Sequence, residues 1–505
     1  MTVLADHYPR RRPLFGVEDD GGEQITEGRC LAIEVEQDTT THLRRQGGRD
    51  RLTPEATRRG LRISVIEGSW ATVHIVMTGN AFLTGYALFL GSNDFQLGLI
   101  TSVPLLMQLF QIFGARLVER TGRRKLICAW GSFVGRFMWL PIAFLPLLFR
   151  TQALALFLCL YGFGMLLQNL AAPAWLTWMG DLVPKEIRGR YFGLRNRVVG
   201  IVTMVASIVA GLVLDFARDK GNEYAGFLAI QLISVVAAAV AFHYIRQQPE
   251  PPYRGERMPP LGEYVTRPLR DPSYQRILAF YLYWLFAVGI STPFFAAHLL
   301  KNLGWTFKQI AYLNIVTAVM TIVSQPFWGR LIDRYGHKPV LMVCEVVILH
   351  LPLYYAFCPP GVRWPIWLNA VLAGLFWSGF NLAIFSLALA ALPNKGRPGY
   401  MAAFSAWSGV MNFLAITFGG WLALRLSNVT FEVVGMALGN YQILFVLTSL
   451  LRFPGFALLH RVREVEAVPT VILVRQTFNE LNRRLGLGYF LVFPYSNGRR
   501  RKKPS

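Results

Sequence analysis

Long stretches without charge constrain this chain more than any other feature. Its 505 residues are 53% hydrophobic and only 16% charged, whereas a soluble domain carries about 25% charged residues. The charges crowd into three segments, 1–70, 246–276 and 461–505. About 360 nearly apolar residues remain, room for roughly twelve lipid-spanning helices of about 20 residues each with short turns. The composition predicts a polytopic membrane protein and excludes soluble enzymes, secreted disulfide scaffolds and disordered chains.

The apolar segments fall into two groups of six. The linker 246–276 separates them, and its prolines and charges forbid a span. We therefore expect a disordered N-terminus at 1–65, a six-helix bundle at 66–245, a second one at 277–460 and a basic tail at 461–505. The expected spans are 71–91, 95–117, 126–149, 152–180, 192–215, 224–245, 277–300, 308–330, 339–358, 365–391, 399–424 and 436–460.

Lys and Arg are unevenly divided between the two sides of these spans. The side with both termini carries 42 and the other side 7, while Arg136 and Arg452 lie inside spans. Because cytoplasmic loops carry the excess of positive charge, both termini are expected in the cytoplasm. This topology explains the net charge of +22 without nucleic-acid binding. Five consecutive cations, Arg499 to Lys503, either attract anionic lipid headgroups at about 1 kcal/mol each or only reinforce the topology.

Two loops on the basic side repeat each other. Residues 115–125 read ARLVERTGRRK after the second span, and residues 329–338 read GRLIDRYGHK after the eighth. A second repeated motif follows the fourth and tenth spans, where the tripeptide Asn-Leu-Ala at 169–171 recurs at 381–383. Two repeated motifs in the same order predict that the second six spans duplicate the first. In the loops, Leu117, Glu119, Arg120 and Gly122 find their counterparts in Leu331, Asp333, Arg334 and Gly336.

The loop chemistry favours a tight, partnered turn. Gly122 and Gly336 permit positive φ between antiparallel helices. Glu119 and Asp333 end their helices, where a carboxylate is unfavourable for the helix dipole unless it has a partner. The alternative is a topology determinant with a tight turn.

In these loops the sequence resembles the major facilitator superfamily, whose signature is Gly-x-Leu-x-Asp-Arg-x-Gly-Arg-Lys/Arg after helices 2 and 8. The first copy departs from it at Ala115 and Glu119. The resemblance covers about residues 66–460 and implies an all-α fold of twelve transmembrane helices in two pseudo-symmetric six-helix bundles. It also implies that loop contacts latch the halves in an outward-facing state. The gating residues are then Glu119, Arg120, Gly122, Arg123, Arg124, Gly329, Asp333, Arg334, Gly336 and Lys338.

Amide and indole side chains inside spans mark a candidate substrate cavity. Polar groups in a span usually face a cavity or a partner, and the family's architecture implies a central cavity lined by helices 1, 4, 7 and 10 with 2, 5, 8 and 11 beside them. Such a cavity suits a sugar or another neutral molecule; the alternative for each residue is an interhelical hydrogen bond of about 0.6 kcal/mol. The candidates are Asn80, Gln108, Gln111, Gln168, Asn169, Trp284, Asn314, Gln325, Trp377, Asn381 and Asn412.

Three charges lie well inside the expected spans. Arg136 is about 15 Å deep at 1.5 Å per residue, with no Asp or Glu expected at that depth in the first half. Its guanidinium is satisfied either by carbonyls and water or by an anionic substrate. Glu345 and Arg452 lie at similar depths, about 10 and 12 Å from the cytoplasmic side. Their matching depth predicts an ion pair, with proton coupling by Glu345 as the alternative.

These features predict a secondary transporter in the inner membrane of a bacterium. It moves a small-molecule substrate by rocker-switch alternating access, driven by a proton or solute gradient, and works as a monomer. No metal-ligand spacing and no Gly-x-x-x-x-Gly-Lys-Ser/Thr motif occurs, so neither a cofactor nor direct ATP drive is expected. The alternatives are a drug/proton antiporter on the same fold and a non-transporting assembly or sensor protein. An intramembrane enzyme would need a paired catalytic constellation, and the sequence offers none.

Overall fold

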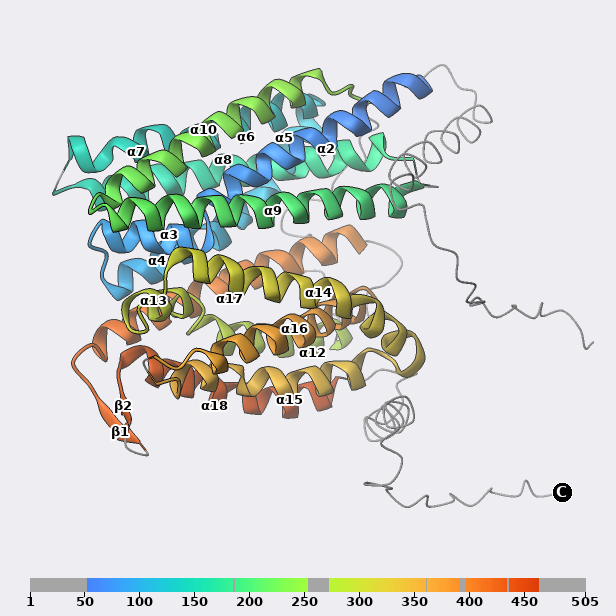
Figure 1. Cartoon of the computed structure of the whole chain (residues 1–505). Helices are drawn as coiled ribbons and strands as arrows, with labels where there is room; N and C mark the ends of the chain where they lie inside the picture. The colour runs from blue at the N-terminus through green and yellow to red at the C-terminus, as the bar shows by residue number, and fades with distance from the viewer. Residues whose placement is uncertain are drawn as a thin grey trace, which may run out of the picture.

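A computed structural model describes residues 52–149, 151–184, 187–252, 272–359, 361–390, 397–433 and 436–462. Nearly all of them form long helices that run side by side in two layers (Figure 1). The N-terminus up to residue 51, most of the linker and the basic tail lie outside the described residues. The expectations for those segments therefore stay predictions.

The first layer holds the N-terminal half. Breaks divide three of its six membrane-length rods into shorter helices, at Thr78–Gly79, at the 3-10 turn η1 and at Met138. The elements are α2 (Pro54–Met77), α3 (Asn80–Phe89), α4 (Asp94–Met107), η1 (Gln108–Phe110), α5 (Gln111–Thr121), α6 (Arg124–Phe137), α7 (Trp139–Leu148), α8 (Ala153–Leu182), α9 (Arg188–Asp219) and α10 (Glu223–Gln247).

The second layer holds the C-terminal half, again with six rods. Its first rod is broken around Pro293, and a short antiparallel hairpin precedes its last helix. The elements are α12 (Pro272–Gly289), α13 (Phe294–Lys301), α14 (Phe307–Tyr335), α15 (His337–Ala356), α16 (Trp364–Ala390), α17 (Arg397–Arg425), β1 (Phe431–Val433), β2 (Met436–Leu438) and α18 (Asn440–Arg461).

The described helices agree with twelve predicted spans. Eleven of the rods are long and apolar enough to cross a membrane by length and composition. The first rod begins at Pro54, well before the predicted span 71–91, because Thr53 caps it through the N–H of Ala56 and Pro54 occupies its first turn. Its early residues combine a buried apolar side with charged residues, so composition alone placed residues 54–65 in a disordered segment. That part of the prediction is wrong.

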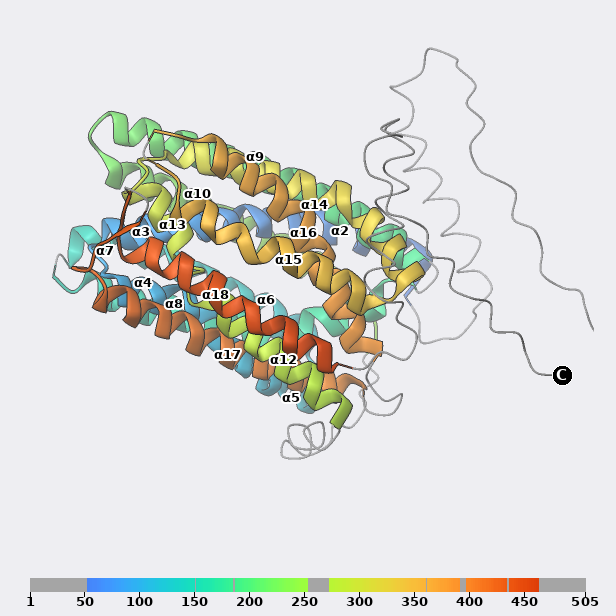
Figure 2. The same ribbon diagram turned by 90° about the horizontal axis from the view of Figure 1, so that it is seen from below.

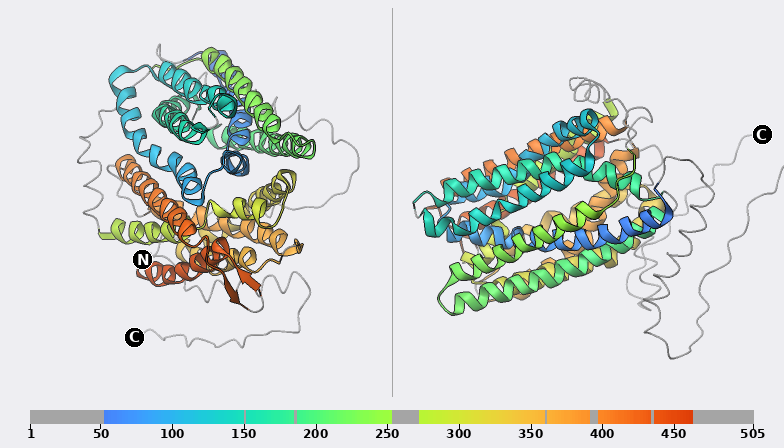
Figure 3. Two further views of the ribbon diagram at one scale, coloured as in Figure 1. Left: turned by 90° about the vertical axis from the view of Figure 1, so that its left-hand side faces the viewer. Right: turned by 90° about the horizontal axis from the view of Figure 1, so that it is seen from above.

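Among the described residues, the apolar contacts between the two halves gather toward one end of the molecule. We call the end that carries the β1–β2 hairpin the hairpin end, and the end where α2 begins and α18 ends the terminal end (Figures 1 and 2). At the hairpin end, one apolar cluster includes buried side chains of both halves, from Val76 to Phe445. Toward the terminal end, two separate clusters each belong to one half, around Trp178 and around Trp284. The left view of Figure 3 looks onto the hairpin end and shows one bundle above the other.

Candidate functional site

A cavity of about 760 Å³ lies between the two halves. Residues of α2, α3, α4 and α8 line it from the first half, and residues of α13, α14, α15 and α17 from the second. Its polar lining consists of amides, hydroxyls and one imidazole, and no Asp, Glu, Lys or Arg of the described chain is among the lining residues. The polar set is His74, Thr78, Asn80, Thr84, Thr101, Tyr161, Gln168, Thr292, Asn314 and Tyr355.

Two helix breaks face each other across this cavity. Thr78 and Thr292, which are equivalent in the repeat, each turn a hydroxyl back onto the carbonyl four residues earlier, His74 O at 2.7 Å and Val288 O at 2.9 Å. After each break a short helix starts at the cavity, α3 at Asn80 and α13 at Phe294. Helix N-termini present free N–H groups and partial positive charge. The N-terminus of one short helix from each half therefore lies at the same cavity.

Three of the predicted cavity amides line the cavity: Asn80, Gln168 and Asn314. Asn80 adopts φ 49°, a left-handed conformation that Asn tolerates better than most residues. Sequence reasoning did not single out two further lining residues, His74 and Thr292. The signal for Thr292 was available, because Thr292-Pro293 stands at the same offset from Thr78-Gly79 as the second loop copy does from the first.

The remaining predicted cavity residues lie elsewhere. Gln111 donates to Asn169 Oδ1 at 2.9 Å, the interhelical hydrogen bond that was the alternative interpretation. Trp284 and Trp377 pack with Phe380 in the apolar cluster of the second half. Four more are outside the lining residues: Gln325 and Asn381 are exposed, and Gln108 and Asn412 are partly buried.

His74 is buried with its tautomer fixed. Its side chain is 1% exposed, and Nδ1 lies 3.2 Å from Ser234 O. A carbonyl oxygen can only accept, so Nδ1 carries the proton and Nε2 of the neutral ring is an acceptor. His74 is among the residues that line the cavity, and the sequence pattern did not reveal it.

At the hairpin end, the two halves are joined first where α9 meets α14. The Asp215 carboxylate accepts the N–H groups of Phe307 at 2.9 Å and Lys308 at 3.0 Å. A carboxylate at a helix N-terminus is favourable because it meets free donors and the positive dipole end. The Phe307 ring stacks on Phe82 and meets the edge of Phe227, both in the first half.

The second junction joins α4 to α17 and α18. Asp94 accepts from Tyr441 Oη at 2.5 Å and from Asn440 Nδ2 at 2.8 Å. One turn further, Gly98 and Gly420 bring the helices so close that a Cβ on Gly98 would lie 3.0 Å from the Gly420 Cα. Beyond it, the hydroxyls of Ser102 and Thr417 lie 3.2 Å apart. The hydrogen bonds of both junctions lie in this one part of the molecule.

The repeated loops have the predicted glycine turns. Gly122 ends α5 with φ 63°, and Gly336 separates α14 from α15 with φ 90°. The expected positive φ at both glycines is confirmed. The gating role of the loop residues stays a prediction for all of them, including Glu119, Arg120, Arg123, Gly329, Asp333 and Arg334.

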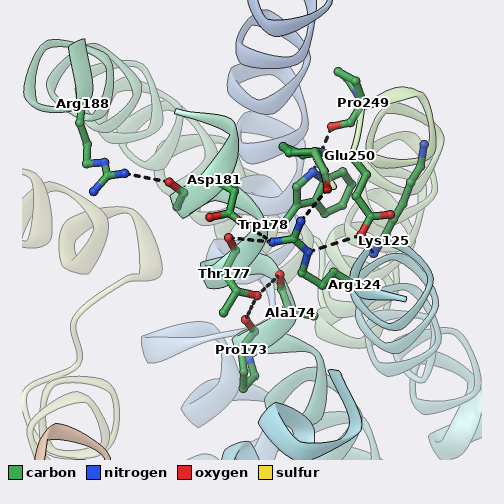
Figure 4. A network of polar contacts seen from close by, with 12 residues as sticks. Arg124, Lys125, Pro173, Ala174, Thr177, Trp178, Asp181, Arg188, Pro249 and Glu250 are labelled. Carbon is green, nitrogen blue, oxygen red and sulfur yellow. Dashed lines mark hydrogen bonds and ion pairs between the residues drawn. The ribbon is translucent and has the colours of Figure 1, made fainter. Parts of the chain in front are cut away.

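The last cation of each loop copy holds the end of its own half. Arg124 is 0% exposed; it pairs with Asp181 at 2.5 Å and Glu250 at 3.5 Å and donates to Pro251 O at 2.8 Å (Figure 4). Lys338, its counterpart in the repeat, donates to His460 O at 2.8 Å and Val462 O at 2.9 Å. Each cation thereby anchors the chain as it leaves the last helix of its bundle. These anchoring contacts stay within one half.

The buried charges of the first half form a pair that the sequence analysis missed. Arg136 Nη1 lies 3.9 Å from Glu67 Oε1, and both side chains are largely buried. The expectation that no carboxylate lies at the depth of Arg136 is wrong, because α2 extends far enough to carry Glu67 inside the bundle. The guanidinium of Arg195 lies beside Gly68, next in the chain to Glu67, and over the Trp175 ring at 5.0 Å.

The predicted pair of the second half is not formed. Within the described chain, no ion pair joins Glu345 and Arg452, although both are buried. Arg452 Nη1 instead donates to Ile348 O at 2.7 Å. Pro352, four residues after Ile348, has no N–H to bond that carbonyl. The free carbonyl is thus the acceptor that draws the guanidinium away from the carboxylate.

Two six-helix halves around a polar central cavity define the fold of a membrane transporter. The profile of the Major Facilitator Superfamily matches residues 70–296 and 277–495. The chain belongs to this superfamily, which confirms the predicted twelve-helix, two-bundle fold. Among curated proteins, no sequence matches the chain.

Solved structures of low sequence identity share this fold. A mutant of the nucleoside transporter NupG has a TM-score of 0.60 at 13% identity, covering 78% of this chain and 99% of its own. A bacterial homologue of the iron transporter ferroportin in an inward-facing state gives 0.59 at 15%, covering 81% and 98%. A D-xylose-proton symporter gives 0.57 at 14%, covering 78% and 96%. At these identities the likeness extends to the fold alone.

Proposed function

We propose that this protein is a secondary active transporter that carries a small neutral solute through the central cavity by rocker-switch alternating access. The observation that carries the proposal is the asymmetry between its ends. The halves share an apolar cluster and the Asp94 and Asp215 junctions at the hairpin end, and have separate clusters toward the terminal end. Such contacts close a central site on one side of the membrane and leave it to open on the other.

The direction of opening follows from charge. The terminal end carries the loops with the excess of Lys and Arg, 42 against 7, so it is the cytoplasmic side by the positive-inside rule. The conformation described here is then inward-facing. In the outward-facing state, Glu119 and Asp333 with their neighbouring cations latch the cytoplasmic side.

The lining supports a neutral solute with several hydroxyl or carbonyl groups. Asn80, Gln168 and Asn314 supply donors and acceptors, and no charged residue of the described lining would balance a charged ligand. A cationic drug finds no carboxylate there, which disfavours the antiporter alternative. Nucleosides and pentoses, the solutes named for two structures with this fold, have this chemistry.

The membrane setting completes the proposal. We place the chain in the inner membrane of a bacterium as a monomer, with gradient-driven transport. The five cations Arg499–Lys503 contact anionic lipid at the cytoplasmic surface.

Uptake into proteoliposomes tests this function. Purified protein is assayed with labelled nucleosides, pentoses, hexoses, amino acids, organic acids and cationic drugs. We expect saturable uptake confined to neutral hydroxylated solutes. Asn80→Ala and Asn314→Ala should each weaken apparent affinity about 5- to 30-fold, as a lost hydrogen bond of about 1–2 kcal/mol implies. Asn412→Ala, outside the cavity lining, is the matched control.

Two results would overturn it. Uptake of charged compounds alone would refute the neutral-solute class. Absence of uptake for every compound by the wild-type protein would favour a non-transporting sensor or assembly protein.

A further inference from the structure

A second group of buried polar side chains lies in the C-terminal half, outside the solute cavity. Glu345 on α15 is 0% exposed, Trp284 on α12 is 1% exposed and Arg452 on α18 is 2% exposed. None of the three is among the cavity-lining residues. They come from three different helices, so their relative positions depend on how those helices pack.

Neither oxygen of the Glu345 carboxyl group has a hydrogen-bond partner within the described part of the chain. The group fits because Gly455 on α18 has no side chain: a Cβ there would collide with Glu345 Oε1 and lie 3.4 Å from the Trp284 ring. The indole Nε1 of Trp284 and Nε of Arg452 also lack described partners. Gly455 leaves space for the Glu345 carboxyl group, and polar groups of Trp284 and Arg452 are nearby. Within the described chain, however, neither carboxyl oxygen forms a hydrogen bond.

Arg452 is near enough to serve as a partner but is occupied elsewhere. It is three residues before Gly455 on α18, hence about one turn away. Its Nη1 donates to Ile348 O, and its guanidinium lies 5.9 Å above the Trp284 ring centre. A change in the rotamers of its flexible stem would exchange this carbonyl for the carboxylate.

We propose that Glu345 is protonated in the conformation described here and ionised in the outward-facing one, so that protonation shifts the balance between the two states. This inference rests on the proposed transport function. An ionised carboxylate buried without a partner would cost several kcal/mol, whereas the neutral acid needs no counter-ion. On release, the proton passes to water, and the carboxylate accepts N–H groups of Arg452, which leaves Ile348 O.

The other groups around Glu345 leave Arg452 as its charged partner. From α16, residues 364–387 contain no ionisable side chain. From α14, Tyr335 belongs to the same apolar cluster as Cys344, the ionisable neighbour of Glu345 on α15. On α12, Tyr281 stacks on Phe404 at 4.8 Å.

The connection to the solute site runs through α12. Trp284 contacts the Glu345–Arg452 group, and Thr292 at the helix break lies eight residues later, about 12 Å along the same rod. When Arg452 leaves the indole face, the packing of the rod that carries the cavity break changes. Proton release and the geometry of the cavity thereby act on the same conformational equilibrium, that of the rod formed by α12 and α13.

Distance measurements on the full-length protein in lipid nanodiscs test this without a known solute. Spin labels at Lys220 and Arg425 report the hairpin end, and labels at Thr121 and Arg330 report the terminal end, in a background without native cysteines. Between pH 5 and 9 we expect a shift from hairpin-end-closed to hairpin-end-open distances, by at most tenfold in population ratio per pH unit for one proton.

Glu345→Gln should hold the hairpin end closed at every pH, since the amide mimics the neutral acid. Arg452→Met should do the same, because the ionised carboxylate then has no partner. Glu67→Gln, which removes the paired carboxylate of the other half, should keep the pH-dependent shift. Asp94→Asn should populate the open state at all pH values by weakening the hairpin-end junction.

The outcomes separate the two proposals. If Glu345→Gln keeps the wild-type pH dependence, or if the wild type exchanges between states without pH dependence, the proton inference is overturned and alternating access stands. If no variant, Asp94→Asn included, shows a second distance at either end, the proposed transport mechanism itself fails.

Discussion

The two halves of this molecule come from one repeated plan, and they keep some equivalent positions while others have diverged. Arg124 and Lys338, equivalent in the repeat, have the same structural role, since each binds backbone carbonyls where the chain leaves the last helix of its half. Arg136 on α6 and Glu345 on α15 both lie on the third rod of their half, yet one is a basic residue and the other an acidic one. The first is paired with Glu67, and the second has no described partner.

This difference shows where symmetry is required and where it is not. The end of each bundle must be fastened in the same way for either half to move as a rigid body. A buried charge has no such requirement: paired, it stabilises one arrangement, and unpaired, it makes the packing sensitive to protonation. In the first half the paired charges stabilise one arrangement, and in the second half Glu345 is the residue for which we propose a response to protonation.

The largest expected difference is in the free energy of unfolding, between a variant of Glu67 and a variant of Glu345. Glu67→Gln leaves Arg136 buried without its counter-ion, and the loss of one partner of a buried pair costs about 3–5 kcal/mol. Glu345→Gln replaces a neutral acid with an amide of the same shape and should change stability by less than about 1 kcal/mol. Unfolding of both variants in detergent, compared at one pH near 6, measures this. Equal losses would show that the halves do not differ in this respect.

A smaller difference is expected between the two anchoring cations. Arg124→Met removes two ion pairs and a buried hydrogen-bond donor, and we expect a loss of about 2–3 kcal/mol. Lys338→Met removes hydrogen bonds to two carbonyls at a half-buried position, which should cost about 1 kcal/mol. Thermal unfolding ranks the variants, and Lys125→Met serves as the neighbouring control. A reversed order would contradict the anchoring role given to Arg124.

The smallest effect concerns the repeated glycines. Gly122 has φ 63° and ψ 0°, near the left-handed region that Asn tolerates, so Gly122→Asn should cost less than about 1 kcal/mol. Gly336 has φ 90° and ψ 172°, a region nearly restricted to glycine, so Gly336→Asn should cost about 1–3 kcal/mol. Thermal unfolding of the two variants measures both stability losses. If both substitutions are tolerated alike, the two turns share one conformation in the membrane.

Prediction from sequence succeeded where a local pattern has one physical solution. Apolar length and the glycine turns at Gly122 and Gly336 each follow from properties of a single segment, whereas the orientation read from the positive loops stays a prediction. The site was predicted less well: Asn80, Gln168 and Asn314 line the cavity, whereas Gln111 and Asn169 bond to each other and Trp284 is in an apolar cluster. A helical residue faces every direction in turn, so its type alone does not tell cavity from interhelical contact.

The sequence by itself determined that this chain spans a membrane twelve times in two related halves. Apolar segments in lipid must satisfy their backbone hydrogen bonds internally, which makes them helices, and the repeated loop motifs relate the two halves. Tertiary structure decided which charges meet. Glu67 reaches Arg136 because α2 starts at Pro54, and Arg452 turns from Glu345 because Pro352 frees a carbonyl on α15. Such pairings depend on helix rotation and on competing acceptors across the bundle, and these are properties of packing.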